Sequence, residues 1–171
     1  MVEKIRNFFK AICLILKYGS DIVFDSLTKL LGREIFQKMI RKEITRAKRY
    51  NSTLSLVFVD IDNLKKVNDI KGHIEGDKVI IVTARFLESC CRESDYVFRY
   101  GGDEFIILLT NTDSVGRTSF EELLKGRLKE NSNLLFSFGG STWNGENSEE
   151  FIEKADAEMY QQKKQKREKK N

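Results

Sequence analysis

The chain has 171 residues, 40% of them hydrophobic, so it is long enough to bury one sizeable core and has the size of a single domain with a short extension. Its formal net charge of +4 is modest and comes largely from a basic C-terminal stretch, so we predict no nucleic-acid partner. The three cysteines have no metal-ligand spacing and their odd number argues against a disulfide framework, which predicts a reduced, cytoplasmic protein.

The first predicted element is a helix over residues 2–18. Apolar side chains from Ile5 to Leu16 recur at helical spacing, and lysines and arginines fill the rest of the helical wheel. Its longest uncharged stretch, Ala11 to Leu16, is far shorter than the roughly 18 to 20 residues of a membrane span. The helix could pack on its own domain, pair with a second chain or lie on an anionic membrane surface, and we favour packing on protein. We assign residues 1–24 to this helix and residues 25–171 to one folded domain.

A second helix and a central strand are predicted next. Helical spacing runs from Arg33 to Lys48 and is broken by Asn51. The following run SLVFVDID is apolar at every position from Leu56 to Val59, which is typical of a strand covered on both faces. Asp60 then lies at the C-terminal end of this strand, where ligands bind in α/β sheets.

Two helices are predicted after the strand. A short one begins at Leu64 and ends at Gly72, and a longer one follows it. The longer helix has one apolar row and a second that widens it, and its two cysteines are interpreted as small core residues. The first row is Val79, Val82, Phe86 and Cys90, and the second is Ile80, Ala84, Leu87 and Cys91.

Residues 95–110, DYVFRYGGDEFIILLT, are predicted to form a β-hairpin, because two apolar runs flank a Gly-Gly-Asp turn. Gly101 and Gly102 carry no Cβ, so they allow a large ligand to approach the backbone closely. Asp103 and Glu104 place two adjacent carboxylates at the tip of the hairpin.

A helix is predicted after the hairpin, because Ser119 and Glu122 have the spacing of a capping box. Residues 134–140 are predicted to form another strand, and Ser148 to cap the last helix.

The last helix has an apolar row that continues into two cations. The row is Ile152, Ala155 and Met159, and the next positions at the same spacing are Lys163 and Arg167. Residues three and four apart share a helix face, so these cations are expected to point toward the domain, where they would need an anion. The alternative is a frayed, solvated tail.

Two acidic clusters are expected to meet at one end of the sheet. Asp60 and Asp62 end the central strand, and Asp103 and Glu104 form the hairpin tip. Carboxylates that lie together repel one another unless one is protonated or a cation lies among them, and Mg²⁺ is the simplest such cation. The alternative is a solvated acidic rim.

Three segments, FRYGGDEF, DIDNLKKVNDIKGHIEGD and DSLTKLLGR, together resemble the GGDEF family of diguanylate cyclases. These enzymes join two GTP molecules into cyclic di-GMP with release of pyrophosphate. The resemblance runs from about Asp25 to about Arg167. It implies an α/β (α+β) fold, similar to the palm of nucleotide cyclases, with a mixed sheet of about five strands, helices on both faces and an active-site hairpin. The residues matched in register are Asp60, Asp62, Lys65, Asn68, Asp69, Gly72, His73, Gly76 and Asp77.

The resemblance implies a metal and catalytic site. Asp60, the main-chain carbonyl of Ile61, and Asp103 would hold Mg²⁺, with Mn²⁺ as an alternative ion, and Glu104 would be a further acidic contributor. Asp103 would also be the general base, and Lys65 would stabilise charge in the transition state.

The resemblance also implies a GTP site. Asn68 and Asp77 would bind the guanine edge, main-chain groups near Asn63 and Leu64 would cradle phosphates, and Lys163 and Arg167 would bind the outer phosphates. The full set of implied substrate-binding residues is Asn63, Leu64, Asn68, His73, Asp77, Gly101, Gly102, Lys163 and Arg167.

Two motifs near these segments bear on regulation and on affinity. Arg92 and Asp95 match the family's RxxD product-inhibition site, although an arginine that closes a helix and an aspartate that opens a strand would look the same. QKKQKRE replaces the customary AKxxGRN near the C-terminal end, so Lys163 and Arg167 are retained while the glycine and the asparagine are lost.

In this family each domain holds one GTP, so the resemblance implies a homodimer during catalysis, with the N-terminal helix as the candidate for holding the pair together. Two alternatives stay open: a catalytically silent receptor of GTP or cyclic di-GMP, and a cyclase that makes a different cyclic dinucleotide.

Overall fold

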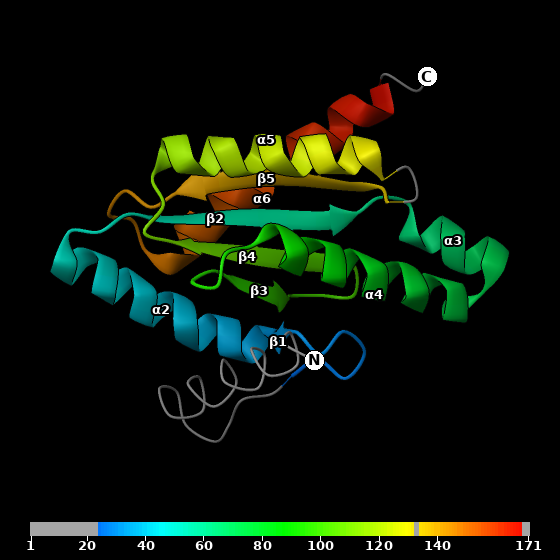
Figure 1. Cartoon of the computed structure of the whole chain (residues 1–171), viewed down its shortest axis with the longest axis horizontal. Coiled ribbons are helices and arrows are strands. Elements are labelled where there is room, and N and C mark those ends of the chain that lie inside the picture. The colour runs from blue at the N-terminus through cyan, green and yellow to red at the C-terminus, as the bar shows by residue number, and fades with distance from the viewer. Residues whose placement is uncertain (1–23, 132–133, 169–171) are drawn as a thin grey trace.

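The computed structural model describes residues 24–131 and 134–168, and the predicted helix over residues 2–18 lies outside them. The described part is built on a five-stranded sheet with the order β1-β3-β4-β2-β5 (Figure 1). The strands are β1 (Leu31–Gly32), β2 (Leu54–Ile61), β3 (Tyr96–Arg99), β4 (Glu104–Thr110) and β5 (Phe136–Thr142). β1 is parallel to β3, whereas β2 is antiparallel to both β4 and β5. The mixed sheet and the hairpin β3–β4 confirm the predicted fold class.

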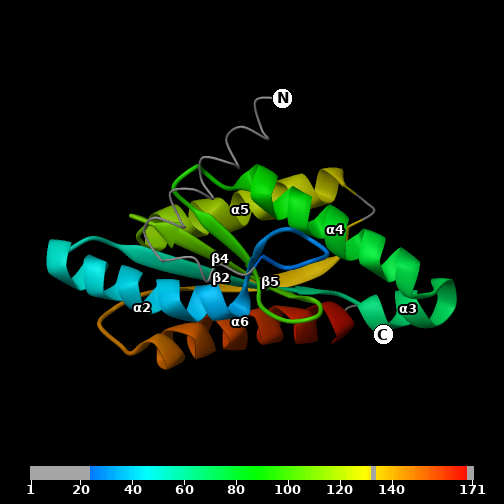
Figure 2. The same cartoon turned by 90° about the horizontal axis from the view of Figure 1, so that it is seen from below.

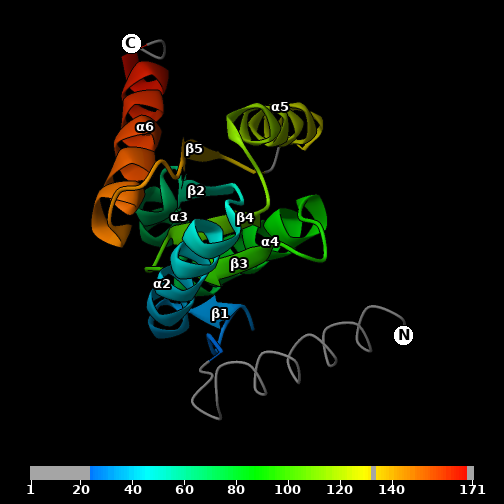
Figure 3. The same ribbon diagram turned by 90° about the vertical axis from the view of Figure 1, so that its left-hand side faces the viewer.

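Helices cover both faces of the sheet (Figures 2 and 3). α2 and α6 lie on one face and α4 and α5 on the other, while α3 extends beyond the end of β2. The helices are α2 (Arg33–Tyr50), α3 (Leu64–Lys71), α4 (His73–Cys90), α5 (Ser114–Glu130) and α6 (Ser148–Glu168). No helix within the described ranges is both long enough and apolar enough to cross a membrane.

β2 is the central strand, as its apolar run predicts. All eight of its residues are buried, and its alternate side chains enter different cores because successive side chains of a strand point to opposite faces. Val57 and Val59 pack under α4 and α5, whereas Leu56 and Phe58 pack under α2 and α6. The two cores therefore fix the register of β2 and the position of Asp60 at its end.

The prediction of which apolar row of α4 is the main buried one is wrong. Ile80, Ala84 and Leu87 are buried, while Val82 is 47% exposed. Residues two apart lie about 200° apart around a helix, so Val82 cannot share the buried face of Ile80. Cys90 is a buried core residue, as predicted.

The predicted starts of two helices are also wrong. α5 begins at Ser114, where the side chain of Asp113 accepts a hydrogen bond from the Gly116 amide at 2.8 Å. Ser119 lies inside the helix and donates to the carbonyl of Val115, a local bond that capping-box spacing cannot distinguish from a cap. At the start of α6 the side chain of Asn147, not Ser148, accepts from a first-turn amide.

α6 packs tightly on β5. This strand begins and ends two residues later than the strand predicted over residues 134–140. A Cβ at Gly139 would lie only 2.1 Å from the backbone nitrogen of Met159, so the absence of a side chain is what lets the helix approach. Phe151, Ala155 and Met159 form the buried stripe of α6. This close contact determines which of the later side chains of α6 reach the end of the sheet.

Candidate active site

The two acidic clusters meet at one end of the sheet, as predicted. Asp60 on β2 is paired directly with Glu104 on β4, and the amide of Ile61 donates to the carbonyl of Asp103 at 3.0 Å. Neighbouring residues in an antiparallel pair have Cβ atoms about 5 Å apart, so the carboxylates of Asp60 and Glu104 are neighbours on one face of the sheet, and Asp103 precedes Glu104 in the turn.

Backbone hydrogen bonds hold the hairpin turn, and the absence of a side chain at Gly101 makes room for Glu104. The amides of Tyr100 and Gly101 both donate to the carbonyl of Glu104, at 2.8 and 3.2 Å. A Cβ at Gly101 would lie 2.4 Å from Oε2 of Glu104. The glycine therefore leaves room for the Glu104 carboxylate to fold back over the turn.

An ion pair ties the same turn to the segment before β1. Arg99 donates to both carboxylate oxygens of Asp25 at 3.1 Å and to the carbonyl of Gly102 at 2.8 Å. Asp25 also accepts from the amide and hydroxyl of Thr28, each at 2.7 Å. Burial opposes ionisation of Asp25, but these bonds from Thr28 and Arg99 lower its pKa. The sequence does not reveal this role of the DSLT segment, because the partner Arg99 lies 74 positions away from Asp25.

Burial and mutual repulsion raise the pKa of two carboxyls at the sheet end. Burial is the largest cause for Asp60; Lys163 opposes it, and Asp103 and Asp62 add to it. For Glu104, burial is followed by repulsion from Asp103 and Asp60. A cation close to these groups would relieve both effects, which is the electrostatic property of a metal or phosphate-transfer site.

Two lysines of α6 supply positive charge at this end. Nζ of Lys163 lies 2.5 Å from Oδ1 of Asp60, which confirms that Lys163 faces the domain. The expectation for Arg167 is wrong: its side chain is exposed, and Lys166 instead reaches Asp62 at 3.3 Å. Each step of four residues turns a helix by about 40° beyond a full turn, so a row extended from Ala155 to Arg167 drifts by about 120°, whereas Lys166 returns to within about 20°.

α3 and α4 form a helical hairpin that carries the predicted guanine-binding residues. The chain turns between them at Gly72, whose φ of 84° lies in the left-handed region that favours glycine. Asn68 on α3 packs against Gly76 on α4, where a Cβ would lie 1.8 Å from Oδ1 of Asn68. This oxygen is buried and has no hydrogen-bond partner among the described residues. Gly76 covers this oxygen, so a ligand could bond it only after a small shift of the Asn68 side chain or of α4.

The other residues of the α3–α4 hairpin that the resemblance singles out are mostly accessible. Lys65, His73 and Asp77 are exposed, whereas Leu64 is buried. Asn63 has a left-handed backbone with φ of 61° and precedes α3 without a side-chain cap on the helix. The first amides of α3 therefore have no side-chain acceptor, as is usual where a helix N-terminus binds an anion.

Asp95 of the RxxD motif has a structural role. It is buried, and its two oxygens accept from the amides of Arg92 at 3.0 Å and of Thr110 at 3.3 Å. The carboxylate thus fixes the turn from α4 into β3, while the Arg92 side chain is exposed.

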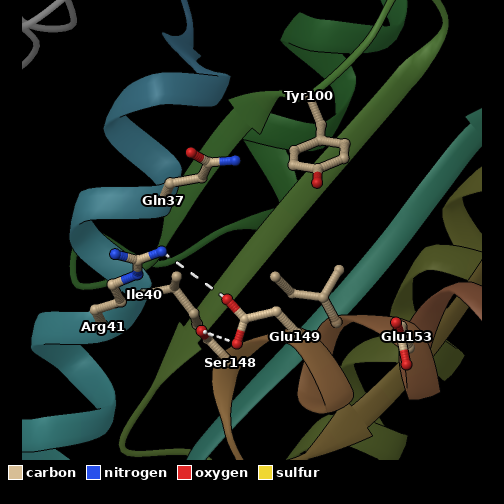
Figure 4. Close-up of a pocket in the computed structure, with 8 residues that line it drawn as sticks. Gln37, Ile40, Arg41, Tyr100, Ser148, Glu149 and Glu153 are labelled. Carbon is tan, nitrogen blue, oxygen red and sulfur yellow. Dashed lines mark hydrogen bonds and ion pairs between the residues drawn. The ribbon is translucent and has the colours of Figure 1, made fainter.

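A separate pocket of about 190 Å³ opens between α2 and α6 (Figure 4). Tyr100 and the Arg41–Glu149 ion pair line it, and none of the predicted site residues does. We assign the candidate site to the sheet end and not to this pocket.

The residues at the sheet end fit a hard divalent cation only in part. Within the described residues, no group of three or more histidine, cysteine, aspartate or glutamate side chains has the arrangement of a complete metal site. The oxygens of Asp60, Asp103 and Glu104 are nevertheless of the kind that Mg²⁺ binds when substrate phosphates complete its shell.

Comparisons with known proteins find similar sequences and similar folds. Residues 22–169 match the family model described as diguanylate cyclase, GGDEF domain. Diguanylate cyclase DosC of Escherichia coli K12 is 35% identical over 150 residues, which cover 82% of this chain and 33% of that protein. The chain therefore spans about a third of the length of this curated relative.

Two solved structures have a similar fold. The GGDEF domain of DgcB from Caulobacter crescentus, in complex with c-di-GMP, aligns with a TM-score of 0.78 and 26% identity, covering 84% of this chain and 91% of that one. Diguanylate cyclase SiaD from Pseudomonas aeruginosa, in complex with its activator SiaC, aligns with a TM-score of 0.79 and 28% identity, covering 96% and 66%.

Proposed function

Because the chain belongs to the GGDEF family of diguanylate cyclases, we propose that it condenses two molecules of GTP into cyclic di-GMP with release of two molecules of pyrophosphate. The observation that carries this proposal is the pairing of Asp60 with Glu104, beside Asp103, next to the uncapped start of α3. These groups combine a site for positive charge with a site for phosphate.

GTP would bind with its base on the α3–α4 hairpin. The Asn68 side-chain amide would bond the guanine edge, and the exposed carboxylate of Asp77 would accept from its N1 and N2 donors. Adenine lacks this pair of donors, so these two residues favour GTP over ATP. His73 would lie close to the same nucleotide.

The phosphates would lie between the start of α3 and the lysines of α6. The amides near Asn63 and Leu64 would bind them, together with Lys163 and the exposed Arg167. The Lys163 ammonium is paired with Asp60, so binding of a triphosphate would draw Lys163 into a contact shared between the two anions.

The reaction needs orientation and charge neutralisation more than covalent catalysis. Asp60, the carbonyl of Ile61, and Asp103 would hold Mg²⁺, or Mn²⁺ in its place, with Glu104 as a further acidic contributor. When bound, the ion would supply positive charge to the reacting phosphate. Asp103 would accept the proton of the attacking ribose 3′-hydroxyl, and Lys65 would neutralise charge that develops on the phosphoryl oxygens.

Two further parts of the proposal concern assembly and control. Each chain would bind one GTP, so the reaction would take place between the two facing sites of a homodimer. Arg92 and Asp95 would bind cyclic di-GMP as an inhibitory product. Since Asp95 also fixes a turn, the exposed Arg92 is the position at which product binding can be examined without disturbing the fold.

Incubation of the purified chain with Mg²⁺ and either GTP or ATP, followed by mass analysis of the products, tests the activity. We expect cyclic di-GMP from GTP and no cyclic product from ATP. Asp103→Asn should lower turnover by at least about a hundredfold while GTP still binds, because loss of a general base costs about 10²–10⁴ in rate.

The same incubation separates the alternatives. Binding of GTP or cyclic di-GMP without turnover would instead indicate a silent receptor, and a product that contains adenine would indicate a different cyclase. A wild-type rate in Asp103→Asn would contradict the role assigned to that carboxylate.

A further inference from the structure

The last turns of α6 contain a cation that the family pattern does not explain. The family motif AKxxGRN has glycine at the position that Lys166 occupies here, within QKKQKRE. Lys166 nevertheless makes two contacts with the sheet end, whereas Arg167, which the family pattern retains, is exposed.

Lys166 joins three elements through Asp62. Its ammonium donates to the carbonyl of Phe136 at 2.6 Å and to Oδ2 of Asp62 at 3.3 Å. Oδ1 of Asp62 accepts from the hydroxyl of Ser137 at 2.8 Å, and the Asp62 amide donates to the carbonyl of Leu135 at 2.9 Å. The backbone amide and both side-chain oxygens of Asp62 are thus bonded to the segment that enters β5 or to α6.

The held residue directly precedes the backbone that would bind phosphate. Asp62 is followed by Asn63, with its left-handed φ of 61°, and then by Leu64 at the uncapped start of α3. A single left-handed residue next to a helix start is a position that needs support from its neighbours. The side chain of Asp62 is only 13% exposed, so the ion pair from Lys166 is partly shielded from water.

We propose that Lys166 is a positioning residue that holds the 62–64 turn in the conformation in which the first amides of α3 can bind phosphate. It acts through Asp62 and touches no reacting atom. The same contacts hold the C-terminal turns of α6 on the sheet, which keeps Lys163 beside Asp60. The link to phosphate rests on the proposed function, whereas the effect on the turn does not.

Hydrogen exchange of the two hydrogen-bonded amides that flank the turn, those of Asp62 and Val67, measured on the whole chain, tests the effect on the turn. We expect Lys166→Met to speed exchange about fivefold, the change that corresponds to losing a partly exposed ion pair and its hydrogen bonds. Lys166→Arg should restore part of the protection. Lys164→Met, at an exposed position on the same turn of α6, is the matched control and should exchange like the wild type.

A thermodynamic cycle identifies the route. If Lys166 acts through Asp62, then Asp62→Asn should speed exchange similarly, and adding Lys166→Met to it should change little more. Additive effects of the two substitutions would overturn the proposed route. Thermal unfolding of each variant establishes that the fold is kept.

Nucleotide binding then tests the consequence, using calorimetry with a non-hydrolysable GTP analogue. We expect Lys166→Met to weaken binding about fivefold, with a matching rise in KM and a smaller effect on kcat. Weaker binding without faster exchange would mean that Lys166 contacts phosphate directly, and it would overturn the positioning role, as would unchanged exchange. If the chain proves to have no cyclase activity, the exchange measurement still decides the role of Lys166 in the turn.

Discussion

At the scale of single residues, the carboxyls of Asp60 and Glu104 lie in surroundings that disfavour their charged forms. Asp60 and Glu104 are each partly withdrawn from water, and each has a second acid beside it. Burial and repulsion both disfavour the charged form. Such an arrangement costs folding free energy in the absence of a cation, which is typical of a residue kept for chemistry and not for packing.

Glu104→Gln should therefore stabilise the chain at neutral pH in the presence of a chelator. The folded pKa of Glu104 lies above its ordinary value of 4.5, so its ionisation destabilises the fold increasingly as pH rises from about 4.5 through the folded pKa. We expect the free energy of unfolding, from denaturant titration, to rise by up to about 1 kcal/mol at pH 7.5 and not to change at pH 4.

Glu122→Gln is the control for this experiment. A hydrogen bond and the charge of Lys125 lower the pKa of the exposed Glu122, so its neutralisation should bring no gain at pH 7.5. A gain for Glu104→Gln that persisted at pH 4 would show that its cause is not ionisation.

At the scale of elements, the α3–α4 hairpin is shaped by one missing side chain. Gly76 lets α4 approach Asn68 so closely that the amide oxygen is enclosed without a partner. A buried acceptor without a partner costs about 1–3 kcal/mol. The helix pair therefore leaves one polar atom unsatisfied, a cost that a bond to a ligand would relieve after a small shift of the Asn68 side chain.

Gly76→Ala should weaken GTP binding with little change in stability. The new Cβ would lie 1.8 Å from Oδ1 of Asn68 and would force that side chain to turn away, while the helix gains about 1 kcal/mol from alanine. We expect about tenfold weaker binding by calorimetry, the effect of losing one hydrogen bond to the base.

Gly126→Ala is the matched control, since an added Cβ on exposed α5 would meet nothing within 4 Å. It should leave GTP binding unchanged and raise the unfolding temperature slightly. Equal effects of Gly76→Ala and Gly126→Ala on GTP binding would contradict the role of Asn68 in binding guanine.

At the scale of the whole molecule, the described domain contains one set of site residues, and the proposed reaction needs two nucleotides. We propose that residues 1–24 associate two chains and that residues 25–171 form the catalytic domain, because the amphipathic pattern over residues 2–18 offers an apolar face. That segment lies outside the described residues, so the assignment rests on sequence.

Deletion of residues 1–20 should lower cyclase activity most strongly at low protein concentration. If the segment holds two chains together, its loss raises the dissociation constant of the dimer, and high concentration compensates by mass action. Specific activity should therefore rise with concentration in the deletion variant, by about tenfold or more over a hundredfold range, and stay nearly constant in the full chain. A loss that is the same at every concentration would contradict this role.

Much of the fold and of the site could be predicted because the relevant signals are local. The apolar run of β2 predicted a central strand, the Gly-Gly-Asp turn predicted a hairpin, and the acids that follow predicted a shared site. Each depends on residues adjacent in the chain, whose backbone preferences and periodicity are set by short-range geometry.

The wrong predictions for α5 and α4 have two different causes. A capping-box spacing at Ser119 also occurs inside a helix, and the apolar side chains of α4 were too numerous to show which row faces the core. Asp113 lies only three residues from the amide that it bonds, so a local signal for the start of α5 was present. The choice between the two apolar rows of α4 belongs instead to the sheet that packs against that helix. Local spacing cannot supply it.

The family and the acidic residues of the candidate site could be recognised from the sequence, because the family pattern and its acids are contiguous motifs. Which cations lie beside those acids depends on how distant parts of the chain pack together. Lys166 and Asp62 are 104 positions apart in the chain, and Arg99 and Asp25 are 74 positions apart. The rotation of the helix over about three turns takes Arg167 away from the buried face that its spacing implied. Such pairs depend on how α6 and the hairpin pack on the sheet, and this packing is the sum of many contacts between distant residues.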